Sequence, residues 1–245
     1  KGEDLSKIEN FEHIAQQRLI IEELAAQQLS LLKIKVARKS NSCNIFSINN
    51  SLTDQLLNSL DFQLTKAQSR CIEEINQDIS SPQPMLRLLQ GDVGSGKTIV
   101  AVFALLQAVF NNFQTAVMAP TEILARQHLQ SFSNYLNHLG IKVAFLSGSQ
   151  NSDERESQIK LIESGEAQVV IGTHALFQEK VSFHNLALVI IDEQHKFGVH
   201  QRLSLAQKAN RTPHQLVMTA TPIPRSLMMS AYADLDTSVI DELPP

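Results

Sequence analysis

The chain has 245 residues, of which 43% are hydrophobic and 19% are charged, and its formal net charge is -4. This composition excludes disordered and collagen-like proteins, and a chain of this length buries roughly 70 to 75% of its unfolded surface without help from a disulfide or a structural metal. The acidic balance excludes a broad basic surface of the kind that coats nucleic acid, although it leaves room for a narrow track.

The first 60 residues divide into a helix and a connector. Over residues 6–38 apolar residues recur near helical spacing, and Ser6 and Glu9 are spaced like a capping box, which predicts one long amphipathic helix. Residues 39–58 are rich in Asn and Ser, which is typical of a connector. We therefore predict a helical extension over residues 1–60 and a second domain over residues 61–245.

Beyond Asp61, short apolar runs alternate with longer helical stretches. This pattern predicts a parallel sheet that is buried on both faces by helices, the α/β architecture. The predicted strands cover residues 85–89, 115–119, 143–146, 168–171, 187–191 and 215–218. In such sheets ligands bind at the carboxyl ends of the strands, so the segments that follow these runs are the candidate site.

The lack of a recognisable targeting segment and the two cysteines both bear on where the protein is located in the cell. No apolar stretch approaches the ~20 residues that cross a bilayer, and the amino end lacks the apolar core of a signal peptide. Cys43 and Cys71 lack the spacing of a metal site, so we predict reduced thiols. These features favour a cytoplasmic protein without a membrane partner.

Residues 91–98 read Gly-Asp-Val-Gly-Ser-Gly-Lys-Thr and stand between a predicted strand and a predicted helix over 99–110, which is the setting of a P-loop. Lys97 would reach the β and γ phosphates of ATP, and the Thr98 hydroxyl would bind Mg²⁺. The residues whose backbone would surround the phosphates are Gly91, Gly94, Ser95 and Gly96. A glycine-rich turn without a ligand is the alternative, which the strand and helix context disfavours.

The strand over 187–191 runs directly into Asp192-Glu193-Gln194-His195. Two carboxylates at the carboxyl end of a buried strand are typical of a Walker B motif. Asp192 would hold Mg²⁺ directly or through water, and Glu193 would orient or deprotonate the attacking water. A solvated acidic pair at a turn is the alternative.

Several motifs in a fixed order resemble those of superfamily 2 helicases of the DExH type. Besides the P-loop and Asp-Glu-x-His, these are residues 119–122, 172–174 and 219–222. The strings LLQGDVGSGKT, IIDEQHKFGVHQR and TATPIPRSL are similar to those of the RecG family of branched-DNA helicases, and the resemblance covers nearly the whole chain. It implies a RecA-like, first motor domain, the cofactors ATP and Mg²⁺, and branched DNA as the partner in recombination and repair.

The resemblance also implies roles for single residues at the nucleotide site. Lys97, Thr98, Asp192 and Glu193 would bind and cleave ATP. His195 and the hydroxyls of Thr219 and Thr221 would connect the nucleotide to the DNA side, although His195 also fits a histidine satisfied at a strand end. Gln68 resembles a glutamine that recognises adenine, but Thr65 and Gln68 are also spaced as a capping box, and both roles need the same amide.

Two further segments would touch the DNA backbone by the same resemblance. One segment holds Thr121, Glu122, Arg126, Gln127 and His128, and the other holds Thr173 and His174; the candidate contacts are Thr121, Arg126, Gln127, Thr173 and His174. Thr121 is also a candidate N-cap of its helix. Family members carry a second RecA-like domain with an arginine finger, and a wedge domain at the branch point. Neither is recognisable in this chain, so we expect the chain alone to hydrolyse ATP very weakly.

Two alternative functions stay open. The first is a transcription-repair coupling translocase similar to Mfd, in which we expect a second glutamate where this chain has Gln194. The second is a P-loop module that uses ATP as a switch without cutting it. Glu193 argues against the switch, because such a module needs no carboxylate to activate water.

Overall fold

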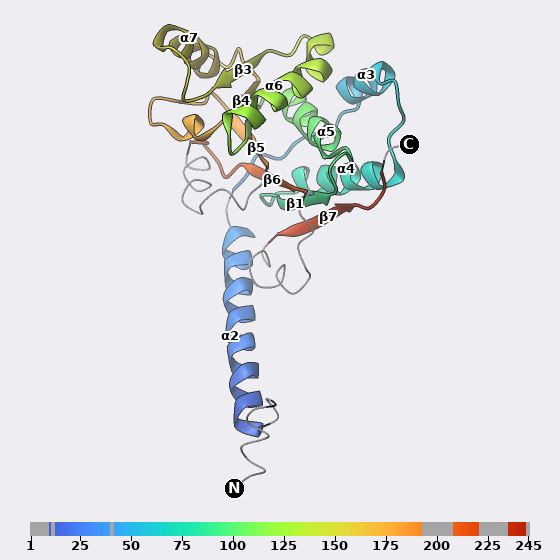
Figure 1. Cartoon of the computed structure of the whole chain (residues 1–245), viewed down its shortest axis with the longest axis vertical. Coiled ribbons are helices and arrows are strands. Elements are labelled where there is room, and N and C mark those ends of the chain that lie inside the picture. The colour runs from blue at the N-terminus through green and yellow to red at the C-terminus, as the bar shows by residue number, and fades with distance from the viewer. Residues whose placement is uncertain (1–9, 11–12, 40–41, 193–207, 221–234, 244–245) are drawn as a thin grey trace. The chain divides into compact units, whose positions relative to one another are not determined.

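The computed structural model describes residue 10 and residues 13–39, 42–192, 208–220 and 235–243. The chain forms two compact units, one of residues 1–40 with 224–234 and one of residues 41–223 with 235–245. In the smaller unit, helix α2 (Ile14–Lys39) is 26 residues long and is confirmed as the predicted helix (Figure 1). The expected capping box at Ser6 and Glu9 lies outside the described residues. No helix in the described ranges is long and apolar enough to cross a bilayer.

The predicted amphipathic character of α2 is wrong. Ile14, Leu19 and Ile20 are all exposed, and at 100° per residue they point to different sides of the helix. Its apolar side chains are therefore distributed around the circumference and form no single stripe. Among its polar residues, Arg18 pairs with Glu22 one turn later, at 2.9 Å.

The larger unit contains a seven-stranded sheet in the order β3-β4-β2-β5-β6-β1-β7, and every pairing is parallel. The strands are β1 (Leu86–Gly91), β2 (Gln114–Met118), β3 (Val143–Leu146), β4 (Val169–Gly172), β5 (Leu186–Asp192), β6 (His214–Thr219) and β7 (Asp236–Ile240). The first six confirm the predicted strands, with small shifts at the ends. The sequence pattern did not predict β7.

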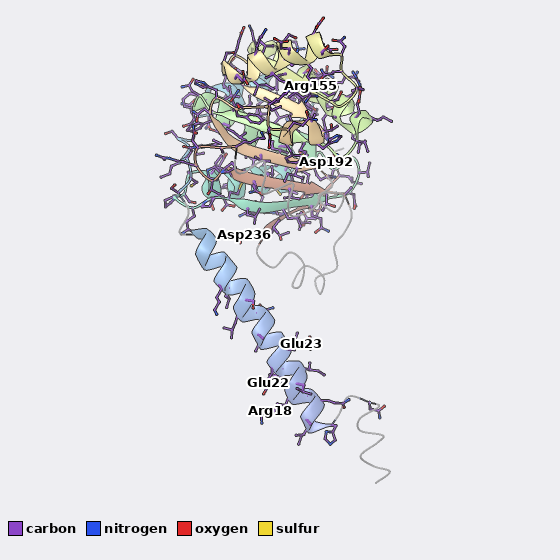
Figure 2. All side chains as sticks on the ribbon, turned by 90° about the vertical axis from the view of Figure 1, so that its left-hand side faces the viewer. Arg18, Glu22, Glu23, Arg155, Asp192 and Asp236 are labelled. Atoms are coloured by element: carbon purple, nitrogen blue, oxygen red, sulfur yellow. The ribbon has the colours of Figure 1, made fainter. Side chains whose placement is uncertain are left out.

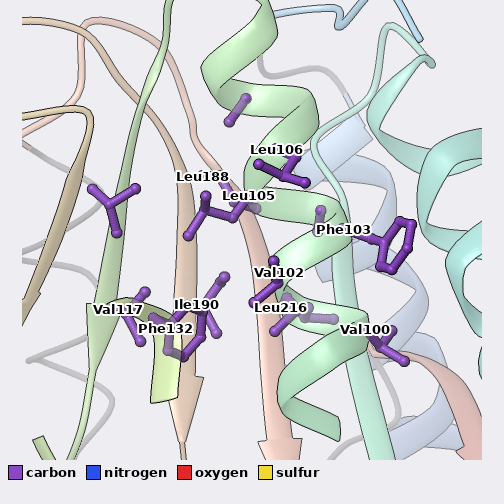
Figure 3. Close-up of a cluster of buried hydrophobic side chains, with 14 of the residues drawn as sticks. Val100, Val102, Phe103, Leu105, Leu106, Val117, Phe132, Leu188, Ile190 and Leu216 are labelled. Carbon is purple, nitrogen blue, oxygen red and sulfur yellow. The ribbon is translucent and has the colours of Figure 1, made fainter. Parts of the chain in front are cut away.

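Side chains on successive positions of the central strands enter two separate cores. Val117 and Ile190 face the larger core, whereas Met118 and Ile191 face the smaller one. Helices α3 (Ser51–Ser59), α4 (Lys66–Ile79), α5 (Lys97–Phe110) and α6 (Glu122–Leu136) contribute to the larger core, and α7 (Ser152–Glu163) and η2 (His174–Phe177) contribute to the smaller one. Figure 3 shows α5 against the strands, with Leu105 and Leu188 among the buried side chains. The sheet is therefore covered on both faces, as predicted.

Residues 42–60, which the sequence pattern places in the extension, pack into the larger core of the sheet unit. Phe46 and Leu56 are buried there, and the Phe46 ring stacks on Phe113 with centroids 5.2 Å apart. The predicted connector also contains the helix α3. The structural units therefore divide at residue 40, while the functional division that we placed at residue 60 stays a prediction.

The two cysteines are buried and free. Burial raises the pKa of Cys71 to about 11, so this thiol stays protonated near neutral pH.

Candidate nucleotide and DNA site

The register of the sheet brings the P-loop and the acidic motif to one edge. Asp192 of β5 pairs with Met218 of β6, and Met218 pairs with Leu89 of β1. Neighbouring strands lie about 4.8 Å apart, so this row spans about 10 Å, and Gly91 ends β1 two residues further along. Asp192 ends its strand at the carboxyl edge (Figure 2). This is the meeting point of the two motifs that the sequence predicted.

The P-loop has the backbone conformation that its glycines allow. Gly94 and Gly96 have φ of 84° and 85°, in the left-handed region that other residues rarely adopt. Gly96 is the N-cap of α5, so the loop leads directly into the amino end of a helix whose interior is buried. Unpaired N–H groups at a helix amino end attract anions. The loop is therefore shaped and polarised for phosphate.

Lys97 and Ser95 lie inside the loop. Lys97 Nζ donates to the carbonyl oxygens of Gly91 at 2.7 Å and Asp92 at 2.9 Å. Ser95 is buried, its hydroxyl has no hydrogen-bond partner among the described residues, and a Cβ on Gly91 would lie 2.5 Å from that oxygen. The close approach explains the glycine at position 91. Thr98 follows in the first turn of α5 and is half-buried.

Gln68 uses both ends of its amide within the protein. Its Oε1 accepts from the N–H of Thr65 at 2.9 Å, which completes the predicted capping box of α4. Its Nε2 donates to the carbonyl of Ser95 at 2.8 Å, and the side chain is buried. A Cβ on Gly96 would lie 2.3 Å from this nitrogen. Gln68 therefore ties α4 to the P-loop, and its contact with adenine stays a prediction.

A pocket of about 470 Å³ opens beside the P-loop. Its lining residues are Phe62, Gln68, Gly94, Gly96, Lys97, Thr98, Ile99, Ser131 and Tyr135. Two aromatic rings next to a phosphate loop suit a planar base, because aromatic faces stack on one another. We did not single out Phe62 and Tyr135 from the sequence, and isolated aromatic residues far from the P-loop offered no signal that would have found them.

The acidic motif is described only as far as Asp192. The carboxylate oxygen Oδ2 of Asp192 lies 2.7 Å from Nε2 of His128, a contact that the sequence did not predict. Thr219 ends β6 between the two motifs and is buried. The predicted roles that lie outside the described residues are those of Glu193, His195 and Thr221.

The residues with predicted DNA roles lie at the other half of the same edge, after β2 and β4. Thr121 caps α6, because its hydroxyl accepts from the N–H of Leu124 at 3.3 Å. Arg126 is exposed, pairs with Glu122 at 2.8 Å and lies over the ring of Phe145. Hydrogen bonds from Ser149 and then from Arg126 lower the pKa of Glu122.

The remaining residues of the DNA half differ in exposure. Gln127 and His174 are exposed, so their side chains can reach a ligand. Thr173 is buried, and its hydroxyl has no partner within the described part of the chain. The structure thus brings all five residues to one edge but leaves Thr173 beneath the surface.

A parallel sheet with a P-loop after one strand and a carboxylate after another defines a RecA-like nucleotide-binding domain. Residues 65–230 match the DEAD/DEAH box helicase family, and the chain belongs to this family. It is 54% identical over 244 residues to the ATP-dependent DNA helicase RecG of Escherichia coli O157:H7, covering 98% of this chain and 35% of that protein. It is 52% identical to RecG of Pasteurella multocida (strain Pm70), with the same coverages.

The structure comparison agrees with the sequence comparison. A solved structure of RecG bound to a three-way DNA junction matches with a TM-score of 0.83 and 44% identity, over 96% of this chain and 32% of that one. The predicted resemblance to RecG is therefore confirmed. The chain spans about a third of the length of the curated relatives that it matches.

Proposed function

We propose that this chain is the ATP-binding part of a DNA helicase motor that remodels branched DNA, such as replication forks and Holliday junctions. The observation that carries the proposal is the row from Asp192 through Met218 to Leu89, which sets the acidic motif beside the P-loop. The residues with predicted DNA roles follow β2 and β4 at the same edge. DNA as the substrate also favours the cytoplasm as the site of action.

The residues of the P-loop fit a magnesium nucleotide. The loop offers backbone N–H groups, the cation of Lys97 and the hydroxyl of Thr98, and Asp192 offers carboxylate oxygens. Carboxylate, hydroxyl and phosphate oxygens are the ligands that Mg²⁺ prefers. When bound, Mg²⁺ neutralises charge on the β and γ phosphates.

In the proposed reaction each side chain has one task. On nucleotide binding, Lys97 would give up its hydrogen bonds to the carbonyls of Gly91 and Asp92 and donate to phosphate oxygens instead. Thr98 and Asp192 would hold the metal. Glu193 would accept a proton from the attacking water or orient it, and His195, Thr219 and Thr221 would pass the change toward the DNA side. Thr121, Arg126, Gln127, Thr173 and His174 would contact the DNA backbone.

The test is DNA-stimulated ATP hydrolysis by the full-length protein and by this chain, with Lys97→Ala as the main variant. We expect Lys97→Ala to lower turnover of the full-length protein by about 10²-fold or more, since it removes a cation that acts on the transferred phosphoryl group. Lys160→Ala is the control, because Lys160 is exposed on α7 and pairs only with Glu156 among the described residues. Unchanged turnover in Lys97→Ala would contradict the proposal.

The isolated chain should hydrolyse ATP roughly 10³ to 10⁵ times more slowly than the full-length protein, because the resemblance assigns the arginine finger to another domain. Glu193→Gln in the full-length protein should abolish turnover while nucleotide still binds. Full turnover in that variant would remove Glu193 from the mechanism, and absence of turnover in the unmodified full-length protein would favour the ATP switch.

A further inference from the structure

His128 of α6 makes a contact at the nucleotide site that none of the predicted roles explains. Its Nε2 atom lies 2.7 Å from Oδ2 of Asp192, although the two residues are 64 positions apart. Both side chains are mostly buried, with 13% of His128 and 14% of Asp192 exposed. A short contact between two largely buried polar groups is well shielded from competing water.

The direction of this hydrogen bond follows from the chemistry of the partners. An ionised carboxylate only accepts, so His128 donates through Nε2–H. The bond occupies Oδ2, and Oδ1 of Asp192 has no hydrogen bond or ion pair among the residues that the structure describes. The carboxylate is therefore held through one of its two oxygens.

The imidazole ring is itself held in place. It meets the ring of Phe132 edge to face, with centroids 5.9 Å apart and an interplanar angle of 66°. Phe132 lies one turn further along α6 and is fully buried in the larger core. The position of Nε2 is thus fixed by the packing of α6 against the sheet.

We propose that His128 is a positioning residue that keeps the Asp192 carboxylate in the orientation that binds the metal of a magnesium nucleotide. The inference rests on the proposed function, because it assumes that Asp192 holds Mg²⁺. Partners that orient a metal-binding carboxylate typically change metal affinity by 10-fold to 100-fold when they are removed. His128 does not touch the P-loop in the contacts of the described residues, so its removal should spare nucleotide contacts that need no metal.

The test measures binding of a fluorescent ATP analogue to this chain while Mg²⁺ is titrated, and again in EDTA. In His128→Leu, which has no donor, we expect the Mg²⁺ concentration at half-maximal binding to rise about tenfold, with binding in EDTA unchanged. His128→Asn should behave in the same way, because its amide is too short to reach Asp192. His128→Gln places an N–H near the position of Nε2 and should restore the midpoint to within about threefold.

The control is His138→Leu, since His138 is an exposed histidine beyond the end of α6. It should leave the Mg²⁺ midpoint unchanged. The inference is overturned if Leu, Asn and Gln at position 128 all keep the wild-type midpoint, or if binding in EDTA falls as much as binding in Mg²⁺. If the unmodified chain shows no Mg²⁺-dependent nucleotide binding, the proposed function fails instead, and the two failures are distinguishable.

Discussion

Two buried, fully hydrogen-bonded side chains at the amino edge of the sheet contrast with two buried hydroxyls at its carboxyl edge. At the amino edge, Gln114 donates to the carbonyls of Ile162 and Ala167 and accepts from the N–H of Asn185. His214 accepts from the N–H of Met85 there and contacts the carbonyl of Asn44. At the carboxyl edge, the buried hydroxyls of Ser95 and Thr173 have no partner among the described residues.

The contrast indicates where the domain gives up stability for function. Buried polar groups are normally hydrogen-bonded, so groups that lack partners are informative when they gather at one site. Ser95 lies in the P-loop and Thr173 follows β4, both next to predicted ligand contacts. Buried polar atoms of Gln16, Asn76 and Thr115 also lack a described partner outside this site, and nothing in the structure explains them.

The largest expected effect on stability is at the amino edge. Gln114→Met keeps the length of the side chain but leaves the carbonyl of Ala167 and the N–H of Asn185 without a described partner and removes one of the donors to Ile162, so we expect the free energy of unfolding to fall by roughly 3 to 5 kcal/mol. Nucleotide affinity of the molecules that remain folded should not change. Denaturant unfolding and nucleotide binding at low temperature measure the two quantities. If Gln114→Met lost nucleotide affinity but kept its full stability, the proposed difference between the amino edge and the carboxyl edge of the sheet would be contradicted.

The next effect is at the carboxyl edge and compares two glycines of the P-loop. In Gly94→Ala the added Cβ has no atom within 4 Å, so the only cost is the strain of a non-glycine residue at positive φ, about 1 kcal/mol. Gly96→Ala has the same strain and also displaces the Gln68 amide, which is bonded at both ends. We expect its free energy of unfolding to fall by about 3 kcal/mol, with loss of nucleotide binding. Equal effects of the two variants in denaturant unfolding would show that the Gln68 contact contributes little.

A third effect depends on pH and belongs to the amino edge. Burial lowers the pKa of His214 below its usual value of 6.5. Above that value His214 is neutral in the folded and unfolded chain, and its contribution to stability is complete. As pH falls below 6.5, the unfolded chain takes up a proton that the folded chain resists, so stability declines by at most about 1.4 kcal/mol per pH unit.

Thermal unfolding between pH 7.5 and 5.5 tests this effect of His214. The melting temperature should fall as the pH is lowered, by no more than a few degrees, because each 1 kcal/mol corresponds to about 2 to 4 °C in a domain of this size. His214→Gln removes the titrating group, so its own decline should be smaller. A decline of the same size in both proteins would assign the pH dependence to other groups.

The sequence predicted the features that a local pattern encodes. Strands buried on both faces appear as apolar runs, and the P-loop needs glycines at fixed positions, so both were recognisable. Strand β7 was missed because Asp-Thr-Ser-Val-Ile at the edge of the sheet has no long apolar run. The amphipathic assignment of α2 failed because apolar residues near helical spacing do not by themselves form one stripe.

The site contacts that escaped prediction join residues far apart in the chain. His128 meets Asp192 across 64 positions, and Gln68 meets Ser95 across 27. Both contacts depend on how α6 and α4 pack against the sheet, and no spacing in a single sequence encodes that packing. For Gln68 the sequence suggested two competing partners, and the structure shows the capping box together with a contact to the P-loop.

The smallest expected effect compares two buried threonine hydroxyls. Thr173→Val and Thr115→Val each remove an oxygen that has no described partner and keep the shape of the side chain. Removing an unpaired buried hydroxyl should raise stability by up to about 1 kcal/mol in both variants. Only Thr173→Val should also weaken DNA binding, by about threefold, because only Thr173 lies beside the predicted DNA contacts. Equal DNA affinity in the two variants would mean that Thr173 serves the fold alone, and that an unpaired hydroxyl at the carboxyl edge is no guide to function.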